Sequence, residues 1–387
     1  MTNEEKVIKR ILKYQRDLDE YTLKLIATRL NSTKGLGLVD LFDIKYLNMV
    51  YGTMRDIEYK VEYTRKQQKK ELEKILPSSA ISAYYAMKGL YADGGIKQVP
   101  YKDNKEITDY VTQEVTSKVK EFDTILKGVG YPVISNKTNK IIFKSPSDTY
   151  QYIANEAKQQ ELTNPFGYDL WKRKITRGLL RDGLKIYNYN QDTHRYKKQN
   201  SYSYIRNFVK DAVYKLCQGV YNVVANQVGI DGVELSVHYD CALDHIPVQG
   251  HQFHIYEFKK MQSNEDFIDV EGRHYKALER AIGTWNCRHF VYPIIIGKTQ
   301  QRYTDEQLEE IGKKSEYYKV IETSDGEKLS MSYSQYKNNL QRLQDMIDTL
   351  TLDMHVAEKL GDKWLVDYYK TRLSEYKSTL TSLKNVN

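Results

Sequence analysis

Cysteine is scarce in this sequence. Cys217, Cys241 and Cys287 are the three cysteines among 387 residues. An odd, low number at wide spacing argues against a disulfide-stabilised scaffold and favours a reducing compartment.

Long apolar runs are also missing. One of the best, residues 290–296, is interrupted by Pro293, whereas a membrane-spanning helix needs about 20 apolar residues. The first six residues are polar and acidic, so they lack the basic segment and apolar core of a secretory signal. We therefore expect neither a membrane span nor a signal peptide.

The common enzyme motifs are absent as well. The sequence has no Gly-x-x-x-x-Gly-Lys-Ser/Thr phosphate loop, no Gly-x-Gly-x-x-Gly and no Gly-x-Ser-x-Gly nucleophile elbow. We predict that the protein is not an enzyme and that it uses no cofactor.

Phenylalanine is rare, whereas tyrosine is abundant, with 9 of the former and 34 of the latter. Tyrosine combines a large apolar face with a polar tip and therefore suits half-buried interfaces. The composition favours a protein that works in contact with other proteins.

Positive charge is in modest excess, with a net charge of +8. From Gln301 to the end there are 13 basic and 15 acidic residues, so this part carries −2 and the remainder carries +10. Such an excess is compatible with a polyanionic partner such as DNA. A lysine-rich solvated surface explains it equally well.

The apolar spacing predicts an α+β protein with three consecutive regions. Residues 1–160 read as mostly helical, residues 161–300 as helices with a short sheet and His-rich loops, and residues 301–387 as a β-hairpin followed by a helical hairpin. Helices are expected over 40–76, ended by Pro77, and over 104–126, 168–186, 202–228, 304–312, 334–360 and 363–383. Strands are expected over 141–143, 233–238, 253–258 and 290–295, with a hairpin over 317–331 that turns at Asp325-Gly326.

Histidine is concentrated in one stretch. Between residues 238 and 289 lie His238, His245, His251, His254, His274 and His289, with Asp240, Cys241, Asp244 and Cys287 among them. Imidazole and thiolate bind zinc when three or four of them converge. The spacing fits no established zinc pattern, so we expect no bound metal and assign these side chains to hydrogen bonds that hold irregular loops together. Zinc ligation stays the alternative interpretation.

Basic side chains gather at two places in the first 300 residues. The candidates for contact with DNA phosphates are Arg65, Lys66, Lys69, Lys70, Lys172, Arg173, Lys174 and Arg177. Such runs are more often a solvated helix face.

Two blocks in the His-rich stretch resemble the phage minor capsid protein 2 family. In residues 238–250 that family shows His, three small or polar residues, Arg-Pro, Asp or Ser, His and then Trp-Gln-Gly. This chain keeps His238, Asp244, His245, Gln249 and Gly250, but it has Ala242-Leu243 in place of Arg-Pro and Val248 in place of Trp. Residues 283–293 are similar to the family's Asn-Cys-Arg-His element followed by an aromatic-Pro pair, here Asn286, Cys287, Arg288, His289 and Pro293.

A third block, in the C-terminal helices, follows the first two in the family's order. It includes Leu340-Gln341-Arg342-Leu343, Gly361-Asp362 and Tyr376. The resemblance is good over residues 201–383 and loose before them. The chain is also distantly similar to head morphogenesis proteins of the phage Mu F type, which end in a comparable Asn-Cys-Arg element.

The resemblance implies a minor structural protein of a tailed-phage head that acts at the portal vertex in head assembly, with a further role in DNA packaging or ejection. Its partners would be the portal protein, the major capsid protein and, through non-specific phosphate contacts, packaged DNA. Its location would be the virion, after assembly in the host cytoplasm. The family-motif residues would have structural roles. Two alternatives stay open: a metal-dependent nuclease or hydrolase that uses the His-rich loops, and a DNA-binding internal head protein.

Overall fold

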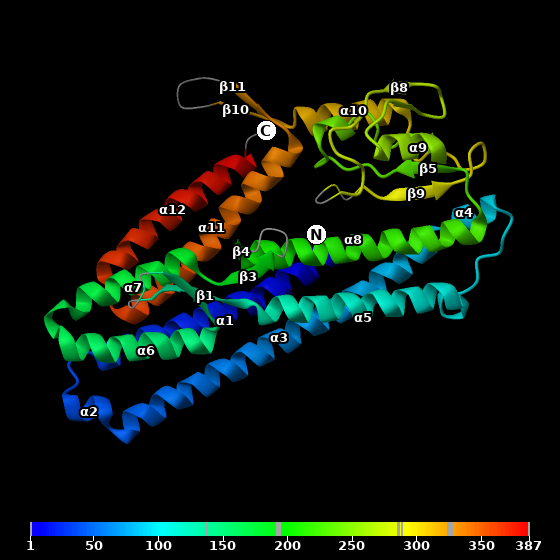
Figure 1. The fold of residues 1–387 in the computed structure, drawn as a ribbon. Helices are drawn as coiled ribbons and strands as arrows, with labels where there is room; N and C mark the ends of the chain where they lie inside the picture. The colour runs from blue at the N-terminus through cyan, green and yellow to red at the C-terminus, as the bar shows by residue number, and fades with distance from the viewer. Residues whose placement is uncertain are drawn as a thin grey trace. The chain divides into compact units, whose positions relative to one another are not determined.

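The computed structural model describes residues 2–135, 138, 140–190, 195–284, 287, 289–322 and 328–385. Long helices and small antiparallel sheets make up the fold (Figure 1), which confirms the predicted α+β class. The chain divides into two compact units, one of residues 1–73, 119–209 and 346–375, the other of residues 74–118, 210–345 and 376–387. Each passage between the units lies within a helix, namely α3 (Ile44–Ala86), α5 (Lys105–Lys127), α8 (Ser201–Val228), α11 (Tyr333–Leu360) and α12 (Lys363–Asn385).

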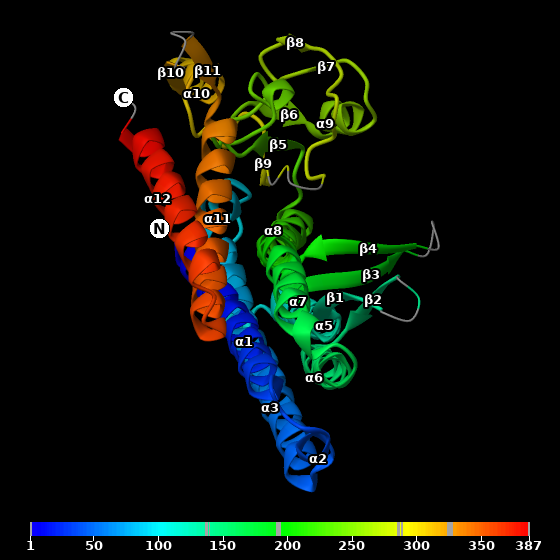
Figure 2. The same ribbon diagram turned by 90° about the vertical axis from the view of Figure 1, so that its left-hand side faces the viewer.

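In the first unit, helices pack on a four-stranded antiparallel sheet. Besides its parts of the shared helices, it contains α1 (Asn3–Thr33), α2 (Leu38–Phe42), β1 (Val129–Ile134), β2 (Ile141–Lys144), α6 (Pro146–Thr163), α7 (Tyr168–Asp182), β3 (Lys185–Asn190), β4 (Arg195–Asn200) and a 3-10 turn at Pro165–Gly167. The strand order is β2-β1-β3-β4, and α6 and α7 contact β1 (Figure 2). Tyr131 and Ile186 of the sheet and Tyr150 and Tyr168 of the helices are almost completely buried, so the core lies between these layers.

The second unit contains a three-stranded sheet surrounded by irregular loops. Its own elements are α4 (Lys88–Asp93), β5 (Gly232–Leu235), β6 (Gln252–His254), α9 (Ile255–Gln262), β7 (Phe267–Ile268), β8 (His274–Tyr275), β9 (Val291–Ile294), α10 (Asp305–Glu316), β10 (Lys319–Glu322), β11 (Lys328–Met331) and 3-10 turns at Tyr101–Asp103 and Leu243–His245. The strand order is β6-β5-β9, with both pairings antiparallel. Apolar side chains of the sheet, α9 and the loops form the core, including Val233, Leu235, Phe253, Met261 and Phe267.

Pro77 does not end its helix, which corrects the prediction of a helix over 40–76. α3 continues through Pro77 to Ala86. Leu72, Leu76, Ala80 and Tyr84 recur every four residues across the proline, and all four are buried. Burial of this stripe outweighs the loss of one backbone hydrogen bond at the proline.

The predicted helix over 168–186 ends early, at Asp182. Gly183 adopts φ +58°, and its N–H donates to the Leu179 carbonyl at 2.7 Å, so it stops the helix. The next residues form β3, which had no counterpart among the predicted strands. Ile186, expected at the end of the helix, lies opposite Val129 of β1 and is fully buried.

The predicted strand over 253–258 is mostly a helix. β6 ends at His254, and α9 begins at Ile255. Glu257 lies in the first turn of α9, and Lys259 and Lys260 lie in the last turn, which matches the helix dipole. The short segment of aromatic residues resembles a strand, although the charges favour the helix.

The C-terminal elements follow the prediction closely. α11 and α12 meet at Gly361, which has φ +71°, and β10 pairs with β11 as the expected hairpin. The predicted turn at Asp325-Gly326 lies outside the described residues. None of the described helices is long and apolar enough to cross a lipid bilayer.

Candidate functional site

The end of β5 and the approach to β9 bring the two family-like blocks together. Ser236 follows β5, and its N–H donates to the Phe290 carbonyl at 2.8 Å, while the Ser236 hydroxyl accepts from the Phe290 N–H at 2.8 Å. These bonds extend the β5–β9 pairing beyond the strands. His238 and His289 therefore lie next to each other, with ring centroids 4.1 Å apart.

His245 comes to the same place from the 3-10 turn Leu243–His245. Its side chain is almost completely buried, and its ring centroid lies 5.3 Å from that of His289. The Nε2 atom lies 2.8 Å from the Arg280 carbonyl, and Nδ1 lies 3.6 Å from the Cys287 sulfur. One ligand atom from each of His245, Cys287 and His289 lies within 4.8 Å of the other two, and all three residues are buried.

His289 and His238 each use one ring nitrogen and leave the other buried. The His289 Nδ1 atom lies 2.8 Å from the Ser236 carbonyl, and the His238 Nδ1 atom lies 3.1 Å from Asp240 Oδ1. Within the described part of the chain, both Nε2 atoms are buried without a hydrogen-bond partner. Buried polar atoms without partners are uncommon in folded proteins, so these two nitrogens require an explanation.

The electrostatics of this cluster lower the pKa of the Cys287 thiol. Burial opposes ionisation, but the His245 ring and the backbone N–H groups outweigh it, so the pKa of the Cys287 thiol lies below its usual value. Burial likewise lowers the pKa of His245, but the contacts with Cys287 and the Arg280 carbonyl outweigh it and hold that pKa above its usual value. By contrast, burial, reinforced by the neighbouring His238, lowers the pKa of His289 to about 3, so this ring is neutral at physiological pH.

Cys241 and Asp240 flank the cluster with opposite behaviour. Burial raises the pKa of the Cys241 thiol to about 12, so this cysteine is a neutral core residue. The hydrogen bond from His238, followed by the contact with Lys337, holds the pKa of the Asp240 carboxyl well below its usual range. Asp240 is therefore an anion that orients the His238 ring.

Gln249 and Gly250 support the loop that carries His238. The Gln249 Oε1 atom accepts from the His238 backbone N–H at 3.0 Å. Gly250 has φ +77°, and its N–H donates to the Leu235 carbonyl at 3.0 Å. Both residues hold the loop against the end of β5.

Asp244 and Pro293 also have local structural contacts. The Asp244 carboxylate accepts from the Glu279 backbone N–H at 3.0 Å. Pro293 lies in β9 opposite Val233 of β5. Asn286 and Arg288 lie outside the described residues.

The six histidines do not form one site. His238, His245 and His289 converge, whereas His251 lies 3.9 Å from Asp269, which pairs with Arg273. His254 stacks on Tyr256, and His274 is exposed in β8. The sequence grouped these residues correctly in one unit but could not separate the cluster from the others.

A buried acid that the sequence did not single out lies in β5. Glu234 is completely buried, and its carboxylate accepts from Arg302 Nη1 at 2.7 Å and from Gln252 Nε2 at 3.0 Å. The Arg302 guanidinium also lies 4.1 Å from the centre of the Tyr292 ring. In the sequence, the signal for this buried acid was a glutamate at the centre of an otherwise apolar strand.

The DNA-contact candidates on α3 are partly neutralised within the protein. Arg65 and Lys69 both pair with Asp123, at 3.2 and 3.1 Å. Lys66 and Lys70 are exposed, and neither makes an ion pair with another described residue. The positive charge available on this stretch is therefore smaller than the sequence indicates.

The DNA-contact candidates on α7 are also partly paired within the protein and partly exposed. Lys172 lies 3.5 Å from Asp169, and Arg173 lies 2.9 Å from Asp362. Lys174 is exposed. The fourth, Arg177, stacks its guanidinium 4.8 Å from the centre of the Trp364 ring.

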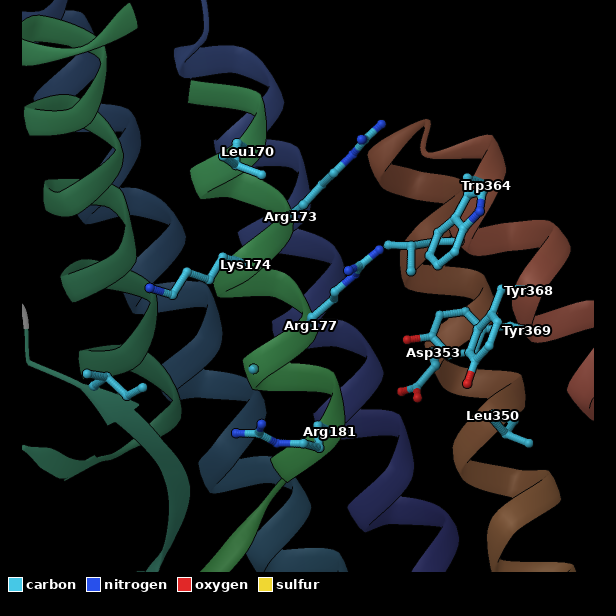
Figure 3. Close-up of a pocket in the computed structure, with 13 residues that line it drawn as sticks. Leu170, Arg173, Lys174, Arg177, Arg181, Leu350, Asp353, Trp364, Tyr368 and Tyr369 are labelled. Atoms are coloured by element: carbon cyan, nitrogen blue, oxygen red, sulfur yellow. The ribbon is translucent and has the colours of Figure 1, made fainter. Parts of the chain in front are cut away.

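Three of the α7 candidates line a pocket within the first unit. It measures about 820 Å³, and Figure 3 shows Arg173 and Arg177 of α7 extending to the side of the aromatic residues of α12, whereas Lys174 points the other way. The lining includes Arg173, Lys174, Arg177, Arg181, Asp353, Trp364, Tyr368 and Tyr369. A pocket with cationic and aromatic walls suits an anionic or aromatic group.

One comparison with known proteins covers nearly the whole chain. A family model described as phage minor capsid protein 2 matches residues 4–384. No curated protein and no solved structure matches the chain significantly. The family match extends from α1 to α12 and so includes both units.

Proposed function

The chain belongs to the phage minor capsid protein 2 family, and we propose that this structural protein of the phage head acts at the portal vertex during head assembly. The observation that carries the proposal is the match over residues 4–384, which leaves no room for a separate domain of another kind within them. A protein present in few copies in a symmetric shell must occupy a position that differs from the many equivalent positions of the major capsid protein. The portal vertex is such a place.

An exposed apolar surface at α2 supports contact with another virion protein. Leu38, Val39, Phe42 and Ile44 expose between 58% and 81% of their surface. Contiguous exposed apolar residues commonly mark an interaction site. We assign this surface, the α2 surface, to contact with the portal protein.

The first test is the composition of purified virions and procapsids by quantitative mass spectrometry. We expect this chain in both, at a small fraction of the major capsid protein. Absence from both particles would refute a role in the virion. A copy number equal to that of the major capsid protein would refute a position at a unique vertex.

The second test is co-purification with the portal protein encoded by the same phage. Val39→Asp together with Phe42→Asp places two carboxylates on the α2 surface and should abolish retention of the chain by the portal. Phe166→Asp is the matched control because Phe166 is a fully exposed aromatic residue of the same unit. Equal retention of both variants would exclude the α2 surface as the contact.

We also propose that the protein contacts packaged DNA through phosphates. The support is the exposed basic residues Lys66, Lys70 and Lys174 on helices of one unit. Phosphate contacts carry no sequence information, and each one releases counterions, so binding should be independent of sequence and should weaken steeply with salt.

A salt series with two unrelated duplexes tests this contact. Lys66→Ala with Lys70→Ala should weaken binding to both duplexes and reduce the salt slope by about 2. Lys313→Ala with Lys314→Ala is the control because these lysines pair with Glu309 and Glu310. No binding at low salt, or a preference for one duplex, would refute the proposal.

A further inference from the structure

We propose that His245, Cys287 and His289 bind a zinc ion through Nδ1, Sγ and Nε2, respectively. This site goes beyond the proposed role at the portal vertex and does not depend on it. It replaces our expectation from the sequence that these side chains only hold loops together by hydrogen bonds.

The spacing of the candidate ligand atoms fits a tetrahedral ion. The His245 Nδ1 atom lies 3.6 Å from the Cys287 sulfur, and one ligand atom from each of His245, Cys287 and His289 lies within 4.8 Å of the other two. With bonds of about 2.3 Å to sulfur and about 2.0 Å to nitrogen, two ligands of a tetrahedral zinc ion lie roughly 3.5 Å apart. The ligand atoms of His245 and Cys287 therefore already have the separation of two zinc ligands. The His289 ligand atom needs only a small movement to reach the same distance.

The hydrogen bonds around the cluster orient each ring as in a metal site. The Arg280 carbonyl accepts from His245 Nε2, and the Ser236 carbonyl accepts from His289 Nδ1, so the proton of each neutral ring is held on the far nitrogen. The lone pairs of His245 Nδ1 and His289 Nε2 then face the cluster. Metal-bound histidines almost always donate their other N–H to a carbonyl or a carboxylate in this way.

Two buried nitrogens without hydrogen-bond partners also point to a bound ion. The His289 side chain is completely buried, and its Nε2 atom has no hydrogen-bond partner among the described residues. The same is true of the buried Nε2 atom of His238, whose Nδ1 atom contacts Asp240. A metal ion would satisfy His289 Nε2, and His238 is a candidate for the fourth ligand because its ring centroid lies 4.1 Å from that of His289.

The sulfur also has the surroundings of a metal-bound thiolate. The Gly283 N–H donates to the Cys287 sulfur at 3.3 Å. Two imidazole nitrogens and one thiolate form a ligand set that suits zinc, whereas hard cations prefer oxygen ligands.

A structural role follows from the position of the ligands. All three are buried, so a substrate would have no open path to the ion. The ion would join the 3-10 turn at His245 to the segment before β9. Both segments are irregular, and the ion would add a link between them to the packing of Cys287 in the core of the second unit.

The zinc content of the full-length chain, purified without a histidine tag and measured by mass spectrometry, tests the site. We expect about one zinc per chain, reduced at least tenfold in Cys287→Ser and His289→Gln, because loss of a ligand weakens metal binding more than loss of a supporting contact does. Cys217→Ser and His274→Gln are the matched controls, since one changes a buried cysteine in α8 and the other an exposed histidine in β8. Both should keep the full content.

Cobalt provides a second measurement that is specific for the sulfur ligand. Co²⁺ added to the chelator-stripped chain should produce the visible bands of a tetrahedral ion and a thiolate charge-transfer band, and Cys287→Ser should lose the latter. If a variant does not fold, the zinc content and cobalt spectrum of the unchanged chain still decide. Zinc well below one equivalent with no tetrahedral cobalt spectrum would overturn the proposal, as would equal zinc content in the four variants.

Discussion

Gly250 occupies a backbone position that disfavours every other residue. Its φ is +77°, and a Cβ atom there would lie 2.3 Å from Leu308 Cδ2 and 2.9 Å from Val237 Cγ2. Gly250→Ala should therefore lower the free energy of unfolding by about 2–4 kcal/mol, because it adds the strain of a left-handed backbone to overpacking. Urea denaturation measures the change.

Gly272 is the matched control for this substitution. It has φ +84°, but a Cβ atom there would meet no atom within 4 Å. Gly272→Ala should lose only about 1–2 kcal/mol of stability from the backbone. Equal losses at the two positions would contradict a packing role for Gly250.

Asp353 should make the stability of the protein depend on pH. Burial, with Asp19 adding to it, raises the pKa of the Asp353 carboxyl to about 8. Below about pH 4 the carboxyl is protonated in both states, so it imposes no penalty on folding. Between about pH 4 and pH 8 the Asp353 carboxyl keeps its proton in the folded protein and loses it in the unfolded chain. The free energy of unfolding therefore falls as pH rises towards 8, where the full penalty of the buried charge is present.

Asp353→Asn removes this dependence and should stabilise the protein at pH 8 by on the order of a few kcal/mol, with a gain that shrinks towards pH 4. Asp367→Asn, at an exposed position in α12, should show no such trend. Thermal melts from pH 4 to pH 9 compare the variants. A gain for Asp353→Asn that is constant across this range would rule out titration as its cause.

The sequence identified the important residue types of the site but not their contacts. His238, His245, Cys287 and His289 stood out because they are clustered and match the family blocks. Their convergence depends on the pairing of β5 with β9, since Ser236 and Phe290 are neighbours only through that pairing. No local spacing encodes such a contact between distant residues, which is why the cluster fitted no zinc pattern.

At the scale of elements, Pro77 removes one backbone N–H donor from the long helix α3. Its replacement measures how much this loss lowers the stability of the protein. Pro77→Ala restores an N–H group and a good helix former inside α3. Proline in a helix interior is disfavoured by about 3 kcal/mol, and the stiffer unfolded chain recovers up to about 1 kcal/mol. We expect the variant to be more stable by about 1–3 kcal/mol.

Ser78→Ala is the control because it changes the neighbouring residue without restoring an amide, and it should change stability by less than about 1 kcal/mol. Denaturant midpoints distinguish the two variants. A destabilised Pro77→Ala would mean that the packing of the proline ring is itself required.

The bounds of an element could be predicted where the apolar pattern was long. The prediction was wrong where charged residues or a glycine determined whether a helix or a strand forms. α8, α11 and α12 follow their predicted ranges within two residues. β3 and β4 were missed because the chain turns from helix to strand at Gly183, and Ile186 fits either pattern. The segment after His254 became α9 because its charges stabilise a helix although its aromatic residues resemble a strand.

At the scale of the whole molecule, the two units lack ordinary linkers. All five passages between them lie inside helices. Domain boundaries usually fall in exposed flexible segments, and proteases cut there first. From the sequence we divided the chain into three consecutive regions. That division stays a prediction, because it concerns consecutive stretches of the chain, whereas each compact unit is built from three separate stretches.

Limited proteolysis should therefore fail to separate the units. Trypsin has sites at Lys74, Lys118 and Lys210, next to three of the boundaries. Cleavage at these lysines should be slower than at lysines and arginines outside helices in the native protein, because helical backbone must unfold locally before it is cut. Mass spectrometry of early fragments measures this order, and the urea-unfolded chain is the control. Early cuts at these three lysines would contradict continuous helices.

The interleaved units also affect how this gene can be inherited. Each unit draws on three stretches of the chain, and any single exchange of gene segments between residues 74 and 375 gives both units parts from two parents. Packing partners such as β1 and β3, or the ends of β5 and β9, would then come from different ancestors whenever the exchange falls between them. Related phages should therefore pass this gene on as one block, and differences that accumulate on one side of a packed pair should be matched by changes on the other.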